Sequence, residues 1–216
     1  MSTKRIVITA VVIAVLLTAL FVYVGLTMRT PGEKARLSSG REVTVTPVDK
    51  MRVRTAEGQP EVDVEKYRLT VGGLVENELS LSFEDIQAMP VEERYVRLPC
   101  VEGWSEDAIW KGVRLSDLLE RAGVDEGART VVFSSPNEYT TSLTVADVEK
   151  TDPILAYQVN GERLPDAQGY PLRLVVPNKL GYKWVKWVDS IELISGDYEG
   201  YWESRGYSND ADATGR

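Results

Sequence analysis

The pattern of apolar and polar positions divides the chain into an apolar N-terminal stretch, a polar stretch and a long body with mixed periods. Residues 6–26 carry no charge. A helix of about 21 residues, at a rise of ~1.5 Å per residue, crosses a ~30 Å hydrocarbon core. We therefore predict a transmembrane signal anchor over residues 1–28. A cleaved signal peptide is the alternative, although its apolar region is normally shorter.

Positive charge lies on both sides of the apolar stretch. Lys4 and Arg5 precede it, and further basic residues follow it. The charges that the insertion machinery meets first favour a cytoplasmic N-terminus. The chain is therefore expected to cross the cell membrane once, with its body on the extracytoplasmic side.

The rest of the chain is divided by composition. Residues 29–45 are polar and charged, without a sustained hydrophobic period, and predict a tether. The folded body is predicted over residues 46–207. Residues 208–216 are small or polar and predict a flexible tail.

Within the body, short strand patterns and short helix patterns alternate irregularly. Ser82 is placed to cap a short helix, residues 115–122 space their leucines as a helix that ends at Gly123, and residues 145–150 predict a third helix. Asn160-Gly161 predicts a hairpin turn. Strands are predicted at residues 67–71, 94–98, 130–133, 140–144, 154–159 and 172–176. The absence of a regular βα repeat predicts an α+β fold.

Composition limits the possible partners. The chain has 216 residues, of which 43% are hydrophobic and 27% charged, and this suits one compact domain beside the N-terminal stretch. The formal net charge is -8. Phosphate contacts require a basic face, so nucleic acid is not expected as a partner.

The single cysteine, Cys100, stands in a chain without histidine. Zinc, haem, copper and iron–sulfur sites draw on clusters of Cys and His, which these side chains do not supply. A cysteine protease needs an imidazole base and is excluded as well. Two interpretations of Cys100 remain: a small buried apolar residue, or a lone thiolate ligand to a metal that an organic cofactor carries.

The sequence around the cysteine reads Cys-Val-Glu-Gly-Trp-Ser, and Ile-Trp-Lys-Gly-Val-Arg-Leu follows shortly after. It resembles the cofactor segment of the sulfite oxidase family of molybdopterin enzymes, especially the compact prokaryotic members. Later family motifs follow in the family order at residues 139–143, 155–161, 169–177, 181–187 and 200–207. The resemblance covers residues 51–207 and implies the sulfite oxidase fold.

The resemblance implies three catalytic residues. The thiolate of Cys100 would bind molybdenum directly, and Arg54 and Tyr157 fall on the positions of the active-site arginine and tyrosine. Ala56 stands where the family often has histidine, which departs from the pattern. Glu102, Glu106 and Asp107 surround the cysteine without an apolar setting, so we expect them on the loop surface.

Molybdopterin ends in a phosphate, so its pocket requires cations and hydrogen-bond donors. The resemblance implies that the cofactor is bound by Cys100 together with Ser134, Gln168, Arg173, Lys183, Trp184, Val185 and Lys186. Ser135 is the alternative to Ser134, and Gln168 stands where the family commonly has histidine or asparagine. Trp104 and Trp110 flank the cysteine and are expected to line the entrance to the metal.

The resemblance therefore predicts a membrane-anchored molybdopterin oxidoreductase that performs two-electron oxygen-atom transfer on a small oxyanion, as sulfite oxidase does. A sulfoxide reductase subunit, acting on oxidised methionine in proteins among other substrates, is the first alternative. A cofactor-free binding module that keeps the fold is the second, motivated by Ala56 and Gln168. The remaining length accommodates neither a haem domain nor a C-terminal immunoglobulin-like domain. Electrons are therefore expected to pass to or from a cytochrome or a haem-bearing membrane protein.

Overall fold

The computed structural model describes residues 32–213. The predicted anchor over residues 1–28 lies outside this range. Residues from Glu33 onward form one unit, which holds the elements described below. Across residues 32–213, no helix has the length and hydropathy needed to span a bilayer.

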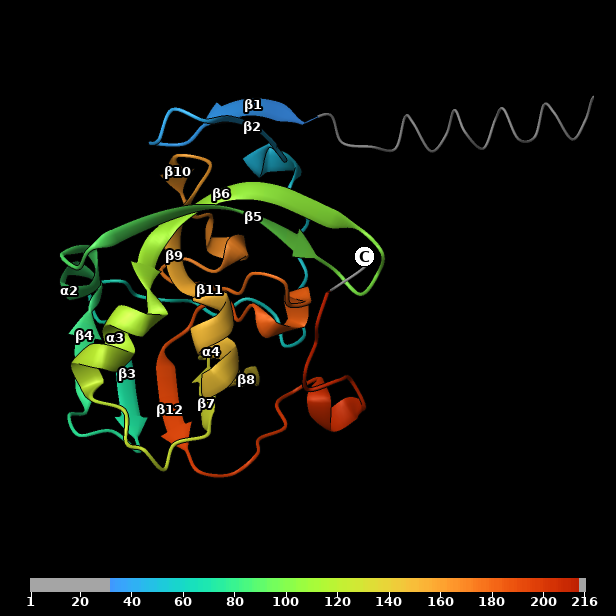
Figure 1. The fold of residues 1–216 in the computed structure, drawn as a ribbon. Helices are drawn as coiled ribbons and strands as arrows, with labels where there is room; N and C mark the ends of the chain where they lie inside the picture. Colours follow the sequence, from blue (N-terminus) through green and yellow to red (C-terminus); the bar gives the residue numbers. More distant parts are fainter. Residues whose placement is uncertain (1–31, 214–216) are drawn as a thin grey trace, which may run out of the picture. The chain divides into compact units, whose positions relative to one another are not determined.

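The first of two five-stranded sheets carries the cysteine segment. Its strands run in the order β10–β9–β6–β5, β11 pairs with β9, and all these pairings are antiparallel. Figure 1 shows β5 and β6 curving over β9 and β11. The strands are β5 (Val91–Pro99), β6 (Ser105–Arg114), β9 (Ile154–Val159), β10 (Glu162–Arg163) and β11 (Arg173–Val175).

The second sheet has the order β4–β3–β12–β7–β8 and is mixed, because β3 and β12 run parallel while the other pairs are antiparallel. A short two-stranded hairpin of β1 (Glu33–Arg36) and β2 (Glu42–Val45) is separate. The strands are β3 (Arg68–Gly73), β4 (Leu79–Ser82), β7 (Thr130–Ser134), β8 (Thr140–Thr144) and β12 (Ser190–Ile194). Two sheets with few helices confirm the α+β prediction.

The helices are short and their ends follow from local sequence. Ser82 and Asp85 form a reciprocal capping box at the start of α2 (Phe83–Gln87). Gly123, at φ 68°, ends α3 (Leu115–Ala122) as predicted. The others are α4 (Val145–Thr151) and the 3-10 turns η1 (Val48–Lys50), η2 (Asp166–Gln168), η3 (Gly181–Lys183) and η4 (Glu203–Arg205).

One continuous core lies between the two sheets. It includes residues from β3, α2, β6, β7 and β9, which are fully or almost fully buried: Leu69, Ile86, Trp110, Phe133 and Leu155. Trp110 belongs to this core and does not line the entrance, contrary to the prediction. Its indole packs edge-on against Trp184, with ring centroids 5.8 Å apart.

The long strand β6 was not predicted, because its early residues are charged. Burial along it alternates at first, and Glu106 points inward, where it is buried and accepts a hydrogen bond from the backbone N–H of Arg52 at 2.6 Å. Glu106 is therefore not a loop surface residue. Farther along, Gly112 lies at a bulge against β9, where a Cβ would come within 1.9 Å of the Leu155 carbonyl oxygen. Only glycine allows the two strands to approach so closely.

The predicted tether contains the β1–β2 hairpin. Val43 and Val45 alternate with exposed residues and bury their side chains against Ile109 of β6. The hydroxyl of Tyr95 donates to the Thr44 carbonyl oxygen at 2.9 Å. The alternation is only four residues long, too short to stand out from the polar sequence around it.

The C-terminal residues also differ from the predicted flexible tail, as far as the structure describes them. The Leu180 N–H donates to the Ala211 carbonyl oxygen, and the Ala213 N–H to that of Asn178, each at 2.8 Å. Ala211 is buried. The polar residues of this segment pair with buried lysines, a partnership that composition alone does not reveal.

Candidate functional site

Cys100 lies in the tight turn between β5 and β6. Its backbone N–H donates to the Trp104 carbonyl oxygen at 2.9 Å, and the Gly103 N–H donates back to the Cys100 carbonyl oxygen at 3.1 Å. The turn holds the thiol half-buried at the end of a rigid strand. Partial burial raises the pKa of the Cys100 thiol, and metal binding would drive its ionisation.

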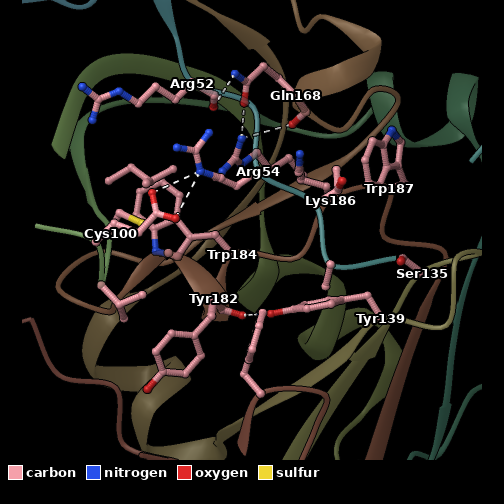
Figure 2. A pocket seen from close by; sticks show the side chains of 18 of the residues that line it. Arg52, Arg54, Cys100, Ser135, Tyr139, Gln168, Tyr182, Trp184, Lys186 and Trp187 are labelled. Atoms are coloured by element: carbon pink, nitrogen blue, oxygen red, sulfur yellow. Dashed lines mark hydrogen bonds and ion pairs between the residues drawn. The ribbon is translucent and has the colours of Figure 1, made fainter. Parts of the chain in front are cut away.

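The thiol faces a cavity of about 320 Å³. Figure 2 shows Cys100, Trp184 and Lys186 around it, with Tyr139 and Tyr182 farther along its wall. Six segments that are distant in sequence contribute to the lining. The lining residues include Arg52, Arg54, Val101, Glu102, Trp104, Ser135, Tyr139, Gln168, Arg173, Tyr182, Trp184, Lys186, Trp202 and Tyr207.

Arg173 is a buried cation in the cavity wall. Its Nη1 donates to the Gln168 side-chain oxygen at 2.6 Å, and its guanidinium lies 5.2 Å from the centroid of the Trp110 ring. Burial lowers the pKa of Arg173 to about 10, partly offset by the charge of Glu106. Even so, Arg173 stays protonated at neutral pH.

Lys186 is the second cation of the wall. Its Nζ donates to the Ala167 carbonyl oxygen at 2.9 Å. Burial, with repulsion from Arg173, lowers the pKa of Lys186 to about 7. Gly169, at φ 112°, packs directly on Lys186, since a Cβ there would lie 2.9 Å from the Cβ of Lys186. The missing side chain at Gly169 thus allows this turn to approach Lys186 closely.

These two cations lack a counter-charge in direct contact. Within residues 32–213, neither Arg173 nor Lys186 forms an ion pair with a carboxylate, and the Arg173 Nε is buried without a hydrogen-bond partner. Buried charge of one sign favours an anion that completes the hydrogen bonds. The phosphate of molybdopterin meets this requirement. The residues therefore fit the cofactor: Cys100 would bind its metal, and Gln168 and Trp184 lie beside the cations.

The mouth of the cavity carries two exposed arginines. The Arg54 Nε lies 3.1 Å from a carboxylate oxygen of Glu102, and the Arg52 guanidinium is 4.9 Å from the centroid of the Trp104 ring. The Gln168 amide donates to the Arg52 carbonyl oxygen at 3.2 Å, which links the mouth to the buried cations. Arg54 and Trp104 are thus placed where the sequence predicts them.

Other residues predicted for the site lie elsewhere. Tyr157 is buried on β9, edge-on to Phe83 at 6.0 Å between ring centroids, and does not line the cavity. Lys183 is fully buried and forms an ion pair with Glu203 at 2.6 Å. The residue pattern of a buried strand does not show which of its two faces points toward a cavity.

Two further corrections concern backbone neighbours. Val185 is buried outside the lining, and its carbonyl oxygen accepts from the Leu174 N–H at 2.8 Å, so it supports the wall from behind. Ser134 is the last residue of β7, paired with Thr140, whereas Ser135 lines the cavity. The alternative serine is therefore the one that the structure brings to the site.

The sequence interpretation missed the aromatic part of the wall. Tyr139, Tyr182, Trp202 and Tyr207 line the cavity, and the Tyr139 hydroxyl donates to the Tyr182 carbonyl oxygen at 2.6 Å. Trp202 and Tyr207 lie in the Gly-Tyr-Trp-Glu-Ser-Arg-Gly-Tyr motif, which carried the signal. From sequence alone, large aromatic residues are most simply interpreted as core residues. Only the fold shows that these four side chains line a cavity.

Comparison with known proteins identifies the family. The model of the oxidoreductase molybdopterin binding domain matches residues 56–202. The chain belongs to this family, and it is a molybdopterin-dependent oxidoreductase of the sulfite oxidase type. The resemblance seen in the motifs is confirmed.

Individual relatives agree with this family. An uncharacterised oxidoreductase, YuiH, of Bacillus subtilis is 40% identical over 67% of this chain and 74% of the relative. Sulfite oxidase of Arabidopsis thaliana is 32% identical, over 76% of this chain and 51% of the relative. The catalytic subunit MsrP of the protein-methionine-sulfoxide reductase of Gluconobacter oxydans is 34% identical, over 63% and 49%.

A solved structure has the same fold. The sulfane dehydrogenase SoxCD from Paracoccus pantotrophus aligns with a TM-score of 0.64 and 26% identity, over 76% of this chain and 51% of that chain. The chain thus spans about half the length of the sulfite oxidase, MsrP and SoxCD chains that it matches.

Proposed function

We propose that this protein transfers an oxygen atom and two electrons at a small sulfur oxyanion, in the direction of sulfite oxidation. The observation that carries the proposal is the placement of Arg52 and Arg54 at the mouth of the cavity that holds Cys100. A guanidinium offers a planar fork of donors that matches an oxyanion. A substrate with two or three negative oxygens would bind there and point its sulfur toward the thiol side.

The reaction converts sulfite and water to sulfate, two protons and two electrons. Bound molybdopterin supplies the metal for oxygen-atom and electron exchange. Of the residues that line the cavity, Arg173 and Lys186 would hold the cofactor's phosphate and Arg54 would orient the oxyanion. Arg54 donates to the Glu102 carboxylate, which partly neutralises its charge when no substrate is bound. The oxygens of a bound substrate would take the place of this carboxylate as the partner of Arg54.

Reduction of a sulfoxide is the second candidate, and a distinct observation favours it. Two large side chains that line the cavity are also exposed, Val101 at 38% and Tyr207 at 37%. An apolar rim suits the carbon groups on either side of a sulfoxide sulfur. In this direction, two electrons and two protons convert the sulfoxide to a thioether and water.

Either direction requires a redox partner, for which we propose a haem protein. Among residues 32–213, no group of three or more His, Cys, Asp or Glu residues is arranged to hold a second metal.

We also propose that residues 1–28 anchor the protein in the cell membrane with the catalytic body outside. The uncharged stretch at residues 6–26 and the preceding basic pair support this orientation.

The deciding experiment compares both substrates on the purified holoprotein. Sulfite with an artificial electron acceptor should give turnover, and Arg54→Gln should raise the KM for sulfite about tenfold or more, because one charged hydrogen-bonding partner is lost. Arg121→Gln, at an exposed site on α3 outside the cavity lining, is the matched control. Turnover of methionine sulfoxide with a reduced dye, without sulfite oxidation, would overturn the preferred direction.

The cofactor-free module is tested separately by metal analysis. Protein expressed in a host that makes molybdopterin should contain close to one molybdenum per chain. Absence of the metal from correctly folded protein would support the binding module instead.

A further inference from the structure

The cavity wall includes a C-terminal strap, which we define as residues 200–213. The strap supplies Trp202 and Tyr207 to the cavity, with their rings 4.9 Å apart between centroids. Tyr207 also packs edge-on against Tyr182 at 5.3 Å. The position of the strap thus determines the shape of this side of the cavity.

A buried ion pair joins the strap to η3. Lys183 is 0% exposed and Glu203 is 4% exposed. The Lys183 Nζ lies 2.6 Å from Glu203 Oε1, and it also donates to the Ser142 carbonyl oxygen at 2.9 Å and to Asn209 Oδ1 at 2.8 Å. The Thr141 hydroxyl donates a hydrogen bond to the same oxygen of Glu203. One ammonium thus connects β8, η3 and two points of the strap.

A second lysine of the same loop holds the end of the strap. Lys179 is buried, and its Nζ lies 2.8 Å from carboxylate oxygens of both Asp147 and Asp212. It also donates to the Asp210 carbonyl oxygen at 2.8 Å. Lys179 and Lys183 therefore attach the strap on both sides of Tyr207, which occupies the stretch between Glu203 and Asp212.

Stability alone gives a weak reason for such a pair. Transfer of two charges from water to the interior costs free energy, and well-packed apolar residues often serve stability equally well. Glu203 Oε2 is buried with no hydrogen-bond partner in the part of the chain that the structure describes, so the pair is not fully compensated. Directional bonds from one ammonium to β8 and to two points of the strap do, however, fix the register of the strap against β8 and η3.

We propose that the Lys183–Glu203 ion pair positions Trp202 and Tyr207 in the cavity wall and thereby sets the affinity for the substrate. Lys183 and Glu203 lie outside the cavity lining and act as positioning residues through the strap. The expected change in KM rests on the proposed function, whereas the expected change in the position of the strap does not.

The first test is Glu203→Gln, which keeps the size of the side chain and removes its charge. We expect the KM for sulfite to rise about tenfold while kcat changes less than about threefold, since a displaced wall weakens binding of substrate and transition state alike. Molybdenum content should not change. Trypsin should cleave after Arg205, within the strap, several times faster than in the wild-type protein. Glu42→Gln, which breaks the exposed Lys34–Glu42 pair, is the matched control.

The double variant Lys183→Met/Glu203→Leu separates positioning from stability. Glu203→Gln leaves Lys183 as a buried unpaired charge and should lower Tm, whereas the double variant removes both charges together, so its Tm should lie close to the wild-type value. The bonds from Lys183 to Ser142 and Asn209 are still missing, so the raised KM and the faster cleavage should persist. Recovery of KM and cleavage rate along with Tm would show a purely stabilising pair and overturn the proposal.

Failure of the proposed function is distinguishable from failure of this inference. Wild-type protein that turns over neither substrate refutes the function, and the cleavage rates of the two variants still test the strap. Wild-type cleavage and wild-type KM in Glu203→Gln would refute the positioning role even if sulfite is the substrate.

Discussion

At the scale of single residues, the cavity combines one thiol with two buried cations that lack a carboxylate in direct contact. Arg173 keeps its charge, whereas Lys186, with a pKa of about 7, is poised between its charged and neutral forms. An anion bound beside Lys186 would raise this pKa and draw a proton onto the amine. A cofactor phosphate bound there and the charge of Lys186 would therefore stabilise each other.

Cys100→Ser tests the metal ligand. Serine preserves the size of the side chain, and the turn around it is held by backbone hydrogen bonds, so the fold should remain. Turnover should fall to the level of a blank, because a neutral hydroxyl is a poor replacement for a thiolate ligand. Activity assays and near-ultraviolet spectra on the same sample measure both effects. Full turnover in this variant would refute the cofactor role of Cys100.

Tyr207→Phe and Tyr157→Phe form a matched pair. Tyr207 lines the cavity and Tyr157 does not, although the resemblance implied a catalytic role for Tyr157. A hydroxyl in the cavity wall can donate to a bound substrate, and loss of such a bond costs about 1 kcal/mol, so kcat/KM should fall about fivefold in Tyr207→Phe. Tyr157→Phe should stay within about twofold of the wild type. The reverse ranking would restore the first interpretation.

Asp189→Asn tests the pH dependence of stability. Burial raises the pKa of Asp189 from 3.8 to about 6. Because the folded state holds this proton more tightly than the unfolded state, stability falls as pH rises from about 4 to about 6. The side chain is half-buried, so the cost above pH 6 is discounted for solvent screening to about 1 kcal/mol.

The amide removes this cost, so Asp189→Asn should unfold at a higher temperature than the wild type at pH 7.5. At pH 4 the two Tm values should coincide. Thermal unfolding at both pH values measures the difference. An equal difference at the two pH values would contradict the assigned cause.

At the scale of elements, the β5–β6 pair places Cys100 in its turn and Glu106 in its interior. The bulge at Gly112 lets β6 continue along β9. The β1–β2 hairpin covers the outer residues Tyr95 and Ile109 of this pair. The hairpin thus supports the strands that carry the cysteine, even though its sequence predicts a tether.

Val45→Ala tests this support. Val45 is almost completely buried beside Ile109, so the loss of two methyl groups and the resulting cavity should cost about 1–2 kcal/mol of unfolding free energy. Thr44→Ala, on the exposed face of the same strand, is the control. Chemical denaturation measures both. Equal stability of the two variants would mean that the hairpin is not part of the cooperative fold.

At the scale of the whole molecule, the sequence predicts different surroundings for the apolar N-terminal stretch and for the described unit. Residues 6–26 predict a helix in lipid, and the acidic body predicts an aqueous one. The proposed orientation rests on the basic residues ahead of the apolar stretch.

Protease added to intact spheroplasts should therefore remove the body while leaving a cytoplasmic marker protein untouched. An antibody against the body and mass spectrometry of the remaining fragment would measure the digestion. Protection of the body until the membrane is opened would place it in the cytoplasm and reverse the proposed orientation.

Local signals predicted much of the fold. The cap at Ser82, the helix end at Gly123 and the turn at Asn160-Gly161 depend on neighbouring residues alone, and each is found where it was predicted. The charged start of β6 and the short hairpin β1–β2 were missed. Their burial depends on partners far away in sequence, which a local pattern does not encode.

The sequence by itself determined the family and its cofactor, because motifs around Cys100, Arg173 and Lys186 stand in the family order, and it predicts Cys100 as the thiol ligand. Only the tertiary structure decided which side chains share the cavity. Lys183 belongs to the same motif as Lys186 yet pairs with Glu203, while Tyr207 lines the wall and Tyr157 does not. Residue type and motif identify a chemistry, but the direction of each side chain depends on strand pairing and on contacts between distant segments.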